Sequence, residues 1–342
     1  MAYDYVPYLA EVEKELRDIL ATREPAAAPL YQMMQYHLGW LDERFQPRLA
    51  PGGKRVRPLI CLLVCEAVGG DWHRAVPGAC AIELIHNFSL LHDDIEDRSE
   101  TRRHRPTAWK LWGIPQGINT GDAMWAISLL AMLRLRGRGF SAEDVLRAIT
   151  QLDEACVELC IGQYLDLHFE SVDSVPLAAY ERMIAGKTAA LLAASAAVGA
   201  VLGGVDNAVV ETYAGFGREF GLAFQIMDDI LGVWGDPAAT GKSAASDILT
   251  KKKALPALYA LHWEQEHGYS DLAALYARPT LAESDVPHAL ALLERAGARE
   301  HTRQQALLHR QLILNYLEAT QMSHPAQDAL RELALSMIER SA

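Results

Sequence analysis

The sequence predicts an all-α protein, with residues 1–342 folded as a single domain around a central helical bundle. Apolar residues recur at helical spacing in nearly every segment, whereas the period-two alternation and Asn-Gly turns of β-hairpins are almost absent. No repeat of fixed period and no shift in composition marks a linker. Half of the residues are hydrophobic and 22% are charged, which allows a large core and argues against disorder.

Prolines and glycines divide the helical segments in the first half of the chain. Pro47 and residues 50–53 separate the second helix from a very apolar third one, and residues 69–71 end that helix. A loop over 102–106 follows the fourth helix. The expected helices cover residues 8–22, 29–45, 58–68, 75–97 and 119–135.

The second half follows the same pattern. Ser141 is the predicted N-cap of a helix that reaches about residue 170, because Asp144 stands three residues further on. Pro176 opens the next helix, and Asp206 caps another that ends near residue 232. The remaining expected features are a mobile loop over 234–242 and helices from 246 to the end, broken near 278–279 and 297.

Charge and cysteine usage narrow the classes of function. The formal net charge of −12 argues against a nucleic-acid partner. Five cysteines are too few and too irregularly placed for a disulfide framework, so we expect small core residues in a reducing compartment and a cytoplasmic protein. The N-terminus lacks the basic and then apolar order of a signal peptide.

One segment has the composition of a membrane span. Residues 188–205 carry no charge, but they are mostly alanine and glycine and are interrupted by Gly203-Gly204. A helix that is surrounded on all sides in a large bundle has the same pattern. We therefore expect a buried helix and no integral membrane segment.

An acidic cluster ends the helix expected over 75–97. In a helix, Asp93 and Asp97 lie one turn apart on the same face, with roughly 5–6 Å between their Cβ atoms. Two such carboxylates repel each other unless a cation lies between them, and Mg²⁺ usually binds through one or two carboxylates plus substrate phosphates. The alternative is a solvated acidic helix end.

A second apolar helix also ends in paired acids, Asp228 and Asp229, and Gln225 lies on the same side of it. Two such sites predict facing helices that hold metal ions between them, as in the cores of other helical bundles. The second pair therefore favours metal binding over a solvated helix end for both clusters.

Basic residues occur where a metal-bound anion would need them. Lys54, Arg55 and Arg57 follow a Gly-Gly loop at a helix start, where free backbone N–H groups add to anion binding. Arginine suits a diphosphate because its planar fork makes bidentate contacts. His86 lies two turns before Asp93 on the same face, which favours anion contact slightly over a core role. The other basic candidates, each also readable as a solvated surface charge, are Arg102, Arg103, Lys187, Lys242 and residues 251–253.

These segments together resemble the trans-isoprenyl diphosphate synthases, or polyprenyl synthetases, over nearly the whole chain. Their order and spacing match the GGKRxRP and DDxxD motifs of that family. The resemblance implies the isoprenoid synthase type I fold, a helical bundle around a central cavity. The matching segments are 52–58 (GGKRVRP), 93–97 (DDIED) with 102–103, 119–122, Gly162-Gln163 with Asp166, 186–188 (GKT), and Phe224-Gln225 with Asp228-Asp229.

The resemblance also implies a reaction. The enzyme would be a homodimeric trans-prenyltransferase that condenses isopentenyl diphosphate with dimethylallyl (DMAPP), geranyl (GPP) or farnesyl (FPP) diphosphate. Asp93 and Asp97 would bind two Mg²⁺ ions and Asp228 a third, all bridging the allylic diphosphate. The other implied roles are Arg102, Lys187, Lys242 and Lys251 on the allylic diphosphate; Lys54, Arg57, His86 and Arg103 on isopentenyl diphosphate; and Thr188 and Gln225 facing the allylic cation.

Two positions depart from the family's pattern. Gly232 stands where the second motif has its third aspartate, which weakens the case for Asp229 as a ligand, although Asp228 can still serve. His104 stands where the family usually has glycine after the arginine pair.

Product length is expected to depend on the helix beneath the first acids. Ser89, four residues before Asp93, is small, and Phe88, five before, is aromatic. One aromatic residue at the fifth position resembles enzymes that make the C20 product, so geranylgeranyl diphosphate is expected, with farnesyl diphosphate second. The alternative is that Phe88 is ordinary core packing and another helix limits the product.

Three rival classes fit less well. A terpene cyclase would not need a second anion site, and a non-catalytic partner subunit should have lost acids from the first motif, which this chain keeps. A di-metal carboxylate oxidase would bind its metals through Glu-x-x-His pairs, whereas the two acidic clusters singled out in this sequence are built on paired aspartates.

Overall fold

The computed structural model describes residues 3–22, 24–48, 53–172, 174–235 and 245–338. The chain forms two compact units. The first unit comprises residues 1–154, 194–211 and 322–329, and the second comprises 155–193, 212–321 and 330–342. The described secondary structure is almost entirely helical, so the predicted all-α class is confirmed.

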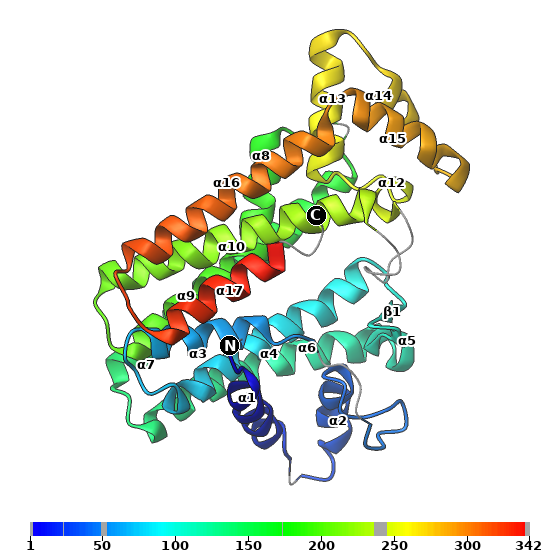
Figure 1. The fold of residues 1–342 in the computed structure, drawn as a ribbon. Coiled ribbons are helices and arrows are strands. Elements are labelled where there is room, and N and C mark those ends of the chain that lie inside the picture. The colour runs from blue at the N-terminus through cyan, green and yellow to red at the C-terminus, as the bar shows by residue number, and fades with distance from the viewer. Residues whose placement is uncertain (1–2, 23, 49–52, 173, 236–244, 339–342) are drawn as a thin grey trace. The chain divides into compact units, whose positions relative to one another are not determined.

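Two long helices that pack against each other, α4 (Trp72–Glu96) and α6 (Ile114–Leu133), form the centre of the first unit (Figure 1). They are covered by α1 (Val6–Ile19) and α3 (Val56–Ala67) on the side of α4, and by α2 (Ala28–His37) on the side of α6. Almost every side chain of α3 is buried, including Cys61 and Cys65. The unit also contains β1 (Thr101–Arg102), β2 (Arg105–Pro106), α5 (Ala108–Trp112), a 3₁₀ turn (Arg134–Arg138) and parts of α7 (Ala142–Glu170), α9 (Ala190–Gly203), α10 (Asn207–Trp234) and α17 (Pro325–Ile338).

The small residues of α9 allow a close approach to α3. A Cβ atom at Gly199 would lie 2.2 Å from the carbonyl oxygen of Cys61, so only glycine fits there. The continuous helical segment Leu177–Gly203 is long and apolar enough to span a membrane, but 78% of its most apolar window is buried within the protein. This burial agrees with the predicted core helix.

A short β-hairpin joins α4 to α5, although the sequence pattern contains no strand signal. β1 and β2 pair antiparallel, Thr101 with Pro106 and Arg102 with Arg105. The two residues between them, Arg103 and His104, both have positive φ, at 52° and 60°, as in a type I′ turn. That turn favours asparagine and glycine, so Arg103-His104 does not identify it in the sequence.

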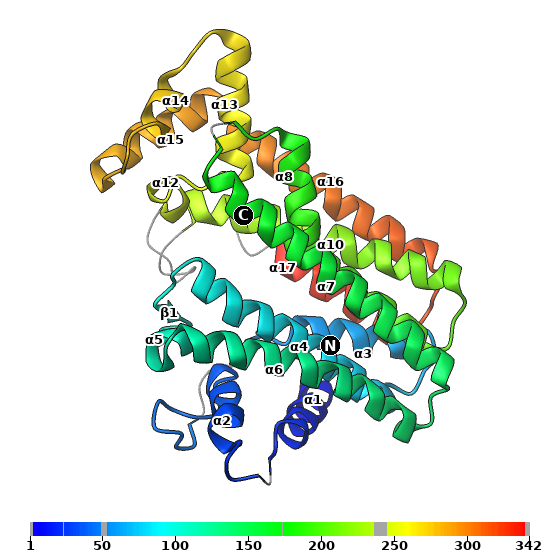
Figure 2. The same ribbon diagram turned by 180° about the vertical axis from the view of Figure 1, so that it is seen from behind.

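The second unit contains most of α10 together with α16 (Ala298–Ala319), and both views show these two helices running side by side (Figures 1 and 2). Gly215 of α10 lies against the ring of Tyr316, and Glu219 lies 2.6 Å from Nδ1 of His309. The outer helices of this unit share a core that includes Ile248, Leu272 and Leu293. These helices are α12 (Ser246–Leu249), α13 (Leu255–His267), α14 (Asp271–Tyr276) and α15 (Val286–Arg295), with a 3₁₀ turn at Glu283–Asp285.

A π-helical turn, Ala185–Ala189, interrupts the helix that begins as α8 (Leu177–Ile184). It packs directly on the backbone of α7. A Cβ atom at Gly162 would lie 2.0 Å from the amide nitrogen of Lys187, and one at Gly186 would lie 2.5 Å from the carbonyl oxygen of Glu158. Single π-turns inside helices frequently mark functional sites.

Several predicted helix limits are confirmed. The Ser141 hydroxyl accepts the Asp144 N–H at 3.0 Å, and Asp206 Oδ1 accepts the Val209 N–H at 3.0 Å. Gly297, with φ of 71°, provides the expected break before α16.

Other expectations need correction. The second helix ends at His37 and not near residue 45, because Gly39 adopts φ of 90° and Leu41 then bridges to Pro47. Cys160 is exposed on α7 and is not a core thiol. Most of the loop expected over 234–242 lies outside the described residues.

Candidate active site

The acidic side chains at the end of α4 point in different directions and differ in exposure. Asp93 is partly exposed and Asp97, the C-cap of the helix, is exposed. Asp94, between them in sequence, is only 1% exposed because it turns toward the β1–β2 hairpin. The two more exposed acids, Asp93 and Asp97, lie one turn apart and are the pair that the sequence pattern suggested for metal binding.

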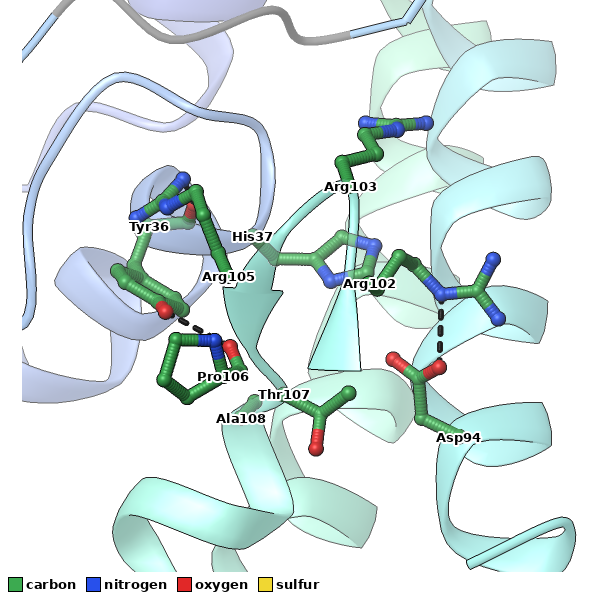
Figure 3. A pocket seen from close by; sticks show the side chains of 9 residues that line it. All are labelled: Tyr36, His37, Asp94, Arg102, Arg103, Arg105, Pro106, Thr107 and Ala108. Carbon is green, nitrogen blue, oxygen red and sulfur yellow. Dashed lines mark hydrogen bonds and ion pairs between the residues drawn. The ribbon is translucent and has the colours of Figure 1, made fainter. Parts of the chain in front are cut away.

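Arg102 connects the hairpin to these acids. Its Nε donates to Asp94 Oδ1 at 2.7 Å (Figure 3), and its Nη2 donates to Asp93 Oδ2 at 3.1 Å. Burial raises the pKa of Asp94 to about 6, although Arg102 acts in the opposite direction. Asp94 Oδ2 is buried without a hydrogen-bond partner among the described residues. Asp94 therefore fixes Arg102 in place, a role that the sequence pattern did not reveal.

The hairpin is itself held by α2. Tyr36 donates its hydroxyl to the carbonyl oxygen of Pro106 at 2.7 Å (Figure 3), and Arg105 donates to the carbonyl oxygens of Tyr36 and Leu41. His37 lines the same small pocket as Arg102 and Arg103. Burial, followed by the charges of those arginines, lowers the pKa of His37 well below its usual value, so its ring is neutral at pH 7.

A basic group lies further along α4. Arg57 Nη1 is 3.4 Å from His86 Nε2, and the Arg103 guanidinium packs on the backbone of Gly53, where a Cβ atom would be 2.8 Å from its Nη2. Burial, reinforced by the charge of Arg57, lowers the pKa of His86 well below its usual value. The structure thus brings together Arg57, His86 and Arg103 as the sequence predicts, with Lys54 exposed in the adjacent loop.

Glu83 is the buried counter-charge of this basic group, and sequence reasoning missed it. It is 3% exposed and accepts hydrogen bonds from Arg55 Nη1 at 2.6 Å and from Asn87 Nδ2 at 2.7 Å. Burial lowers the pKa values of Arg57 and Arg103, and in both cases Glu83 opposes that effect. Its position ten residues before Asp93, inside an otherwise apolar stretch, is the signal that could have identified it. We call the acids and bases of this unit the α4 site.

The second unit holds a separate set of polar residues, the α10 site, around the π-turn. Lys187, on that turn, donates to Asp166 Oδ2 of α7 at 2.5 Å. Thr188 donates its hydroxyl to Gln225 Oε1 of α10 at 2.8 Å. The predicted partners Lys187, Thr188 and Gln225 are therefore neighbours in one unit.

The two paired acids of α10 also point in different directions. Asp228 is partly exposed, whereas Asp229 is 1% exposed. Asp229 accepts hydrogen bonds from Tyr180 Oη at 2.5 Å, from Gln225 Nε2 at 3.0 Å and from the amide N–H of Leu255 at 3.0 Å. Burial raises its pKa despite these donors and the charge of Lys252. The expectation that Gln225 lies on the side of the acids is confirmed.

The lysines after the predicted loop differ in direction. Lys251 donates its Nζ to the carbonyl oxygens of Arg278 and Pro279, at 2.6 and 3.2 Å, on the surface of the unit. Lys252 instead lines a pocket with Lys187 and Asp229. Burial alone would lower the pKa of Lys252, but nearby carboxylates, led by Asp229, raise it. The geometry favours Lys252 over Lys251 as the basic residue of the α10 site; Lys242 lies outside the described residues.

The predicted product-length residues lie on α4. Phe88 is 8% exposed and its ring meets His92 edge-on, with 5.5 Å between the ring centroids. Ser89 is partly exposed, and its hydroxyl donates to the carbonyl oxygen of His86 at 2.8 Å. The Ser89 hydroxyl therefore has its hydrogen-bond partner within α4, and the side chain is small.

The donor set fits a hard divalent ion. Asp93, Asp97 and Asp228 offer carboxylate oxygens, the ligands that Mg²⁺ prefers. Within the described part of the chain, no three His, Cys, Asp or Glu side chains already converge as a complete metal site. Each unit by itself therefore offers one or two such carboxylates, Asp93 and Asp97 on α4 and Asp228 on α10, which is the number that Mg²⁺ usually takes beside substrate phosphates.

Comparison with known proteins extends these observations. The family model of the polyprenyl synthetases matches residues 39–293. The chain is 39% identical over 334 residues to (2E,6E)-farnesyl diphosphate synthase of Mycobacterium tuberculosis, covering 96% of this chain and 90% of the relative. It is 41% identical over 283 residues to geranylgeranyl diphosphate synthase of the same species, covering 82% and 78%.

A solved structure agrees with the sequence comparisons. The polyprenyl synthetase of Streptomyces coelicolor A3(2) is similar with a TM-score of 0.88 and 37% identity, over 97% of this chain and 98% of that one. The acids and bases described above, from Lys54 to Lys252, lie within the range that the family model matches. The chain therefore belongs to the polyprenyl synthetase family and is a short-chain trans-prenyl diphosphate synthase.

Proposed function

We propose that this enzyme makes geranylgeranyl diphosphate by adding isopentenyl units to DMAPP, GPP and FPP. The observation that carries the proposal is the pairing of a buried Phe88 with a small Ser89 on α4. The aromatic residue lies five positions before Asp93, while the residue one turn before Asp93 is a small serine. A product longer than C15 can then extend past Ser89, and farnesyl diphosphate is the competing product.

Divalent metal ions serve this family. We infer three Mg²⁺ ions in this enzyme, with Asp93 and Asp97 binding two of them and Asp228 the third. Bound there, the ions would neutralise charge on the departing diphosphate as a Lewis acid does. The outward direction of these three carboxylates supports the assignment.

Basic side chains would complete the binding of the allylic diphosphate. Arg102 is pre-oriented by Asp94, and Lys187 by Asp166, so little side-chain freedom is lost when a diphosphate binds. We include Lys252 with them in place of Lys251, whose Nζ donates to the carbonyl oxygens of Arg278 and Pro279, and we keep Lys242 from the family's pattern. Preorganised cations of this kind stabilise the charge that develops on the leaving oxygens.

Isopentenyl diphosphate would bind the basic group of the α4 site, Lys54, Arg57, His86 and Arg103. His86 has a depressed pKa, so it is neutral and can donate one ring N–H while its other nitrogen accepts. Arg57 and Arg103 supply the charge. A terpene cyclase has one diphosphate substrate and no use for this second group, which favours a synthase.

Thr188 and Gln225 would face the allylic cation after the diphosphate leaves. The isopentenyl double bond then attacks the cation, and the resulting cation loses a proton to the departing diphosphate. Their oxygens carry partial negative charge and are held by hydrogen bonds, so they stabilise the cation without reorganising.

We also propose that the enzyme is a homodimer. α6 exposes large apolar side chains that a monomer would leave in water, which is typical of an interaction surface. They are Ile114, Ile118, Trp125, Leu130 and Leu133. Light scattering after gel filtration should give twice the chain mass of 37.7 kDa.

One incubation tests the product. The enzyme is supplied with Mg²⁺, isopentenyl diphosphate and, in separate reactions, DMAPP, GPP or FPP, and the products are sized by chromatography. A dominant C20 product from all three primers supports the proposal. Accumulation of the C15 product, with FPP refused as a primer, would identify a farnesyl diphosphate synthase instead.

A further inference from the structure

Asp229 belongs to the second acidic motif but does not face the accessible side of α10. Its side chain is buried, and its two oxygens accept three hydrogen bonds. Two of the donors, the Tyr180 hydroxyl and the Leu255 amide, share Oδ2, while Gln225 Nε2 uses Oδ1. A carboxylate in that position is held by the protein through both of its oxygens.

The contact with Asp229 determines how the Gln225 amide points. A carboxylate can only accept hydrogen bonds, so the NH₂ group of Gln225 must face Asp229. The amide oxygen must then face the other way, where it accepts the Thr188 hydroxyl at 2.8 Å. Because that hydroxyl donates its only proton to Gln225, Thr188 Oγ1 can act toward any further group only as an acceptor.

We propose that Asp229 is a positioning residue that acts through Gln225 to aim the oxygen lone pairs of Thr188 at the allylic cation, and that it is not a metal ligand. The inference rests on the proposed function of Thr188 and Gln225. The two hydrogen bonds form a series in which Thr188 donates to Gln225 and Gln225 donates to Asp229. Each bond therefore polarises the other, and the negative charge on Thr188 Oγ1 increases. The amide N–H of Leu255 also donates to Asp229 Oδ2 and helps to hold the carboxylate in place.

The direct test is Asp229→Asn. An asparagine can donate as well as accept, so it no longer dictates the direction of the Gln225 amide. We expect kcat for condensation to fall about 10- to 100-fold, within the range for losing one preorganised electrostatic contact. KM for both diphosphates should change less than about threefold, because neither contacts Asp229.

A second readout separates positioning from metal binding. The Mg²⁺ concentration that half-saturates thermal stabilisation by inorganic pyrophosphate should be the same for the wild type and Asp229→Asn. A tenfold rise in that concentration would overturn the proposal, because it would make Asp229 a metal ligand.

A double-mutant cycle then tests the route through Gln225. Gln225→Met keeps the length of the side chain and removes both hydrogen bonds. If Asp229 acts through Gln225, Asp229→Asn should lower kcat less than about twofold further in that background. Full multiplication of the two losses would contradict the proposal.

Tyr180→Phe is the matched control, because it removes a hydrogen bond to Asp229 and leaves Gln225 bonded. Its kcat should remain within about threefold of the wild type. A loss as large as that of Asp229→Asn would overturn the proposal, because the loss would then not depend on the bond between Asp229 and Gln225. If Asp229→Asn does not fold, Asp229→Glu replaces it in the same cycle, because it keeps the charge and displaces the carboxylate from Gln225. A wild type with a C15 product would refute the proposed product and leave this cycle interpretable.

Discussion

The carboxylate of Asp247 occupies the space in which a side chain at Gly232 would begin. A Cβ atom at residue 232 would lie 2.1 Å from Asp247 Oδ2 and 2.4 Å from its Cγ. Asp247 is 8% exposed and lies on α12, while Gly232 lies near the end of α10. The glycine that interrupts the second acidic motif is therefore paired with a carboxylate from another segment.

Restoring the family's aspartate by Gly232→Asp should destabilise the protein by about 1–3 kcal/mol, because Asp247 must move and two carboxylates would meet. Gly232→Ala should cost less but have the same sign. Denaturant unfolding monitored by circular dichroism measures both. Gly137→Ala is the control, because a Cβ atom there meets nothing within 4 Å. Equal stability of Gly232→Asp and the wild type would show that the Asp247 side chain moves aside at no cost in free energy.

Asp93→Ala should abolish condensation while leaving helicity unchanged. The residue is partly exposed at the end of α4, so its loss creates no cavity, and Arg102 keeps its contact with Asp94. Product formation with Mg²⁺ and far-ultraviolet circular dichroism are the two measurements. Glu96→Ala, on the same turn and exposed, is expected to retain activity. Turnover by Asp93→Ala would remove that carboxylate from the mechanism.

Hydrophobic spacing and local capping were enough to predict much of this molecule. The period of apolar residues located α4 and α10, and Ser141 and Asp206 identified two helix starts because their caps depend on residues three positions away. The matched motifs selected Asp93, Lys187 and Gln225 as candidate site residues from their order along the sequence alone. These features depend on neighbours in sequence, where the pattern is informative.

The direction in which each side chain of a motif points could not be predicted in the same way. Adjacent residues differ by about 100° around a helix, so one of each acidic pair turns inward, and tertiary packing decides which. Asp94 and Asp229 are inward because Arg102, Tyr180 and Leu255 meet them there. The choice of Lys252 over Lys251, and the π-turn at Ala185–Ala189, likewise depend on partners that are distant in sequence.

Glu83→Gln should lower the free energy of unfolding by about 3 kcal/mol. It removes one member of a buried ion pair and leaves the Arg55 guanidinium, 9% exposed, with weaker compensation. Arg57 and Arg103 lose the same counter-charge, so KM for isopentenyl diphosphate should also rise. Urea unfolding and steady-state kinetics measure the two effects.

Glu13→Gln provides the comparison for Glu83, because Glu13 lies 3.6 Å from the same Arg55 but is 36% exposed. Its effect on stability should be below about 1 kcal/mol, as for other exposed pairs. Equal costs for Glu13→Gln and Glu83→Gln would contradict the view that burial makes Glu83 important.

His104→Gly should stabilise the protein by roughly 1 kcal/mol. His104 has φ of 60° in the two-residue turn of the hairpin, a conformation that costs a side chain with a Cβ atom about 1–2 kcal/mol and costs glycine almost nothing. Part of the gain is offset by the greater freedom of glycine in the unfolded chain. Thermal unfolding of the two proteins measures the difference. A lower melting temperature for His104→Gly would mean that the histidine makes a contact that outweighs the strain.

His37→Gln should remove a pH dependence of stability that the wild type shows between pH 7.5 and 5.5. Burial and four arginines, led by Arg103, depress the pKa of His37 in the folded protein, whereas the unfolded chain takes up a proton near pH 6.5. A depressed pKa means that the unfolded state gains the proton first, so stability is present above about pH 6.5 and is lost as the pH falls. Over this window the wild type should lose up to about 1.4 kcal/mol relative to His37→Gln. Urea unfolding at the two pH values measures this difference, and His37→Met should give the same result as His37→Gln. If stability changed with pH equally in the wild type and in both variants, His37 would take up its proton as readily in the folded protein as in the unfolded chain.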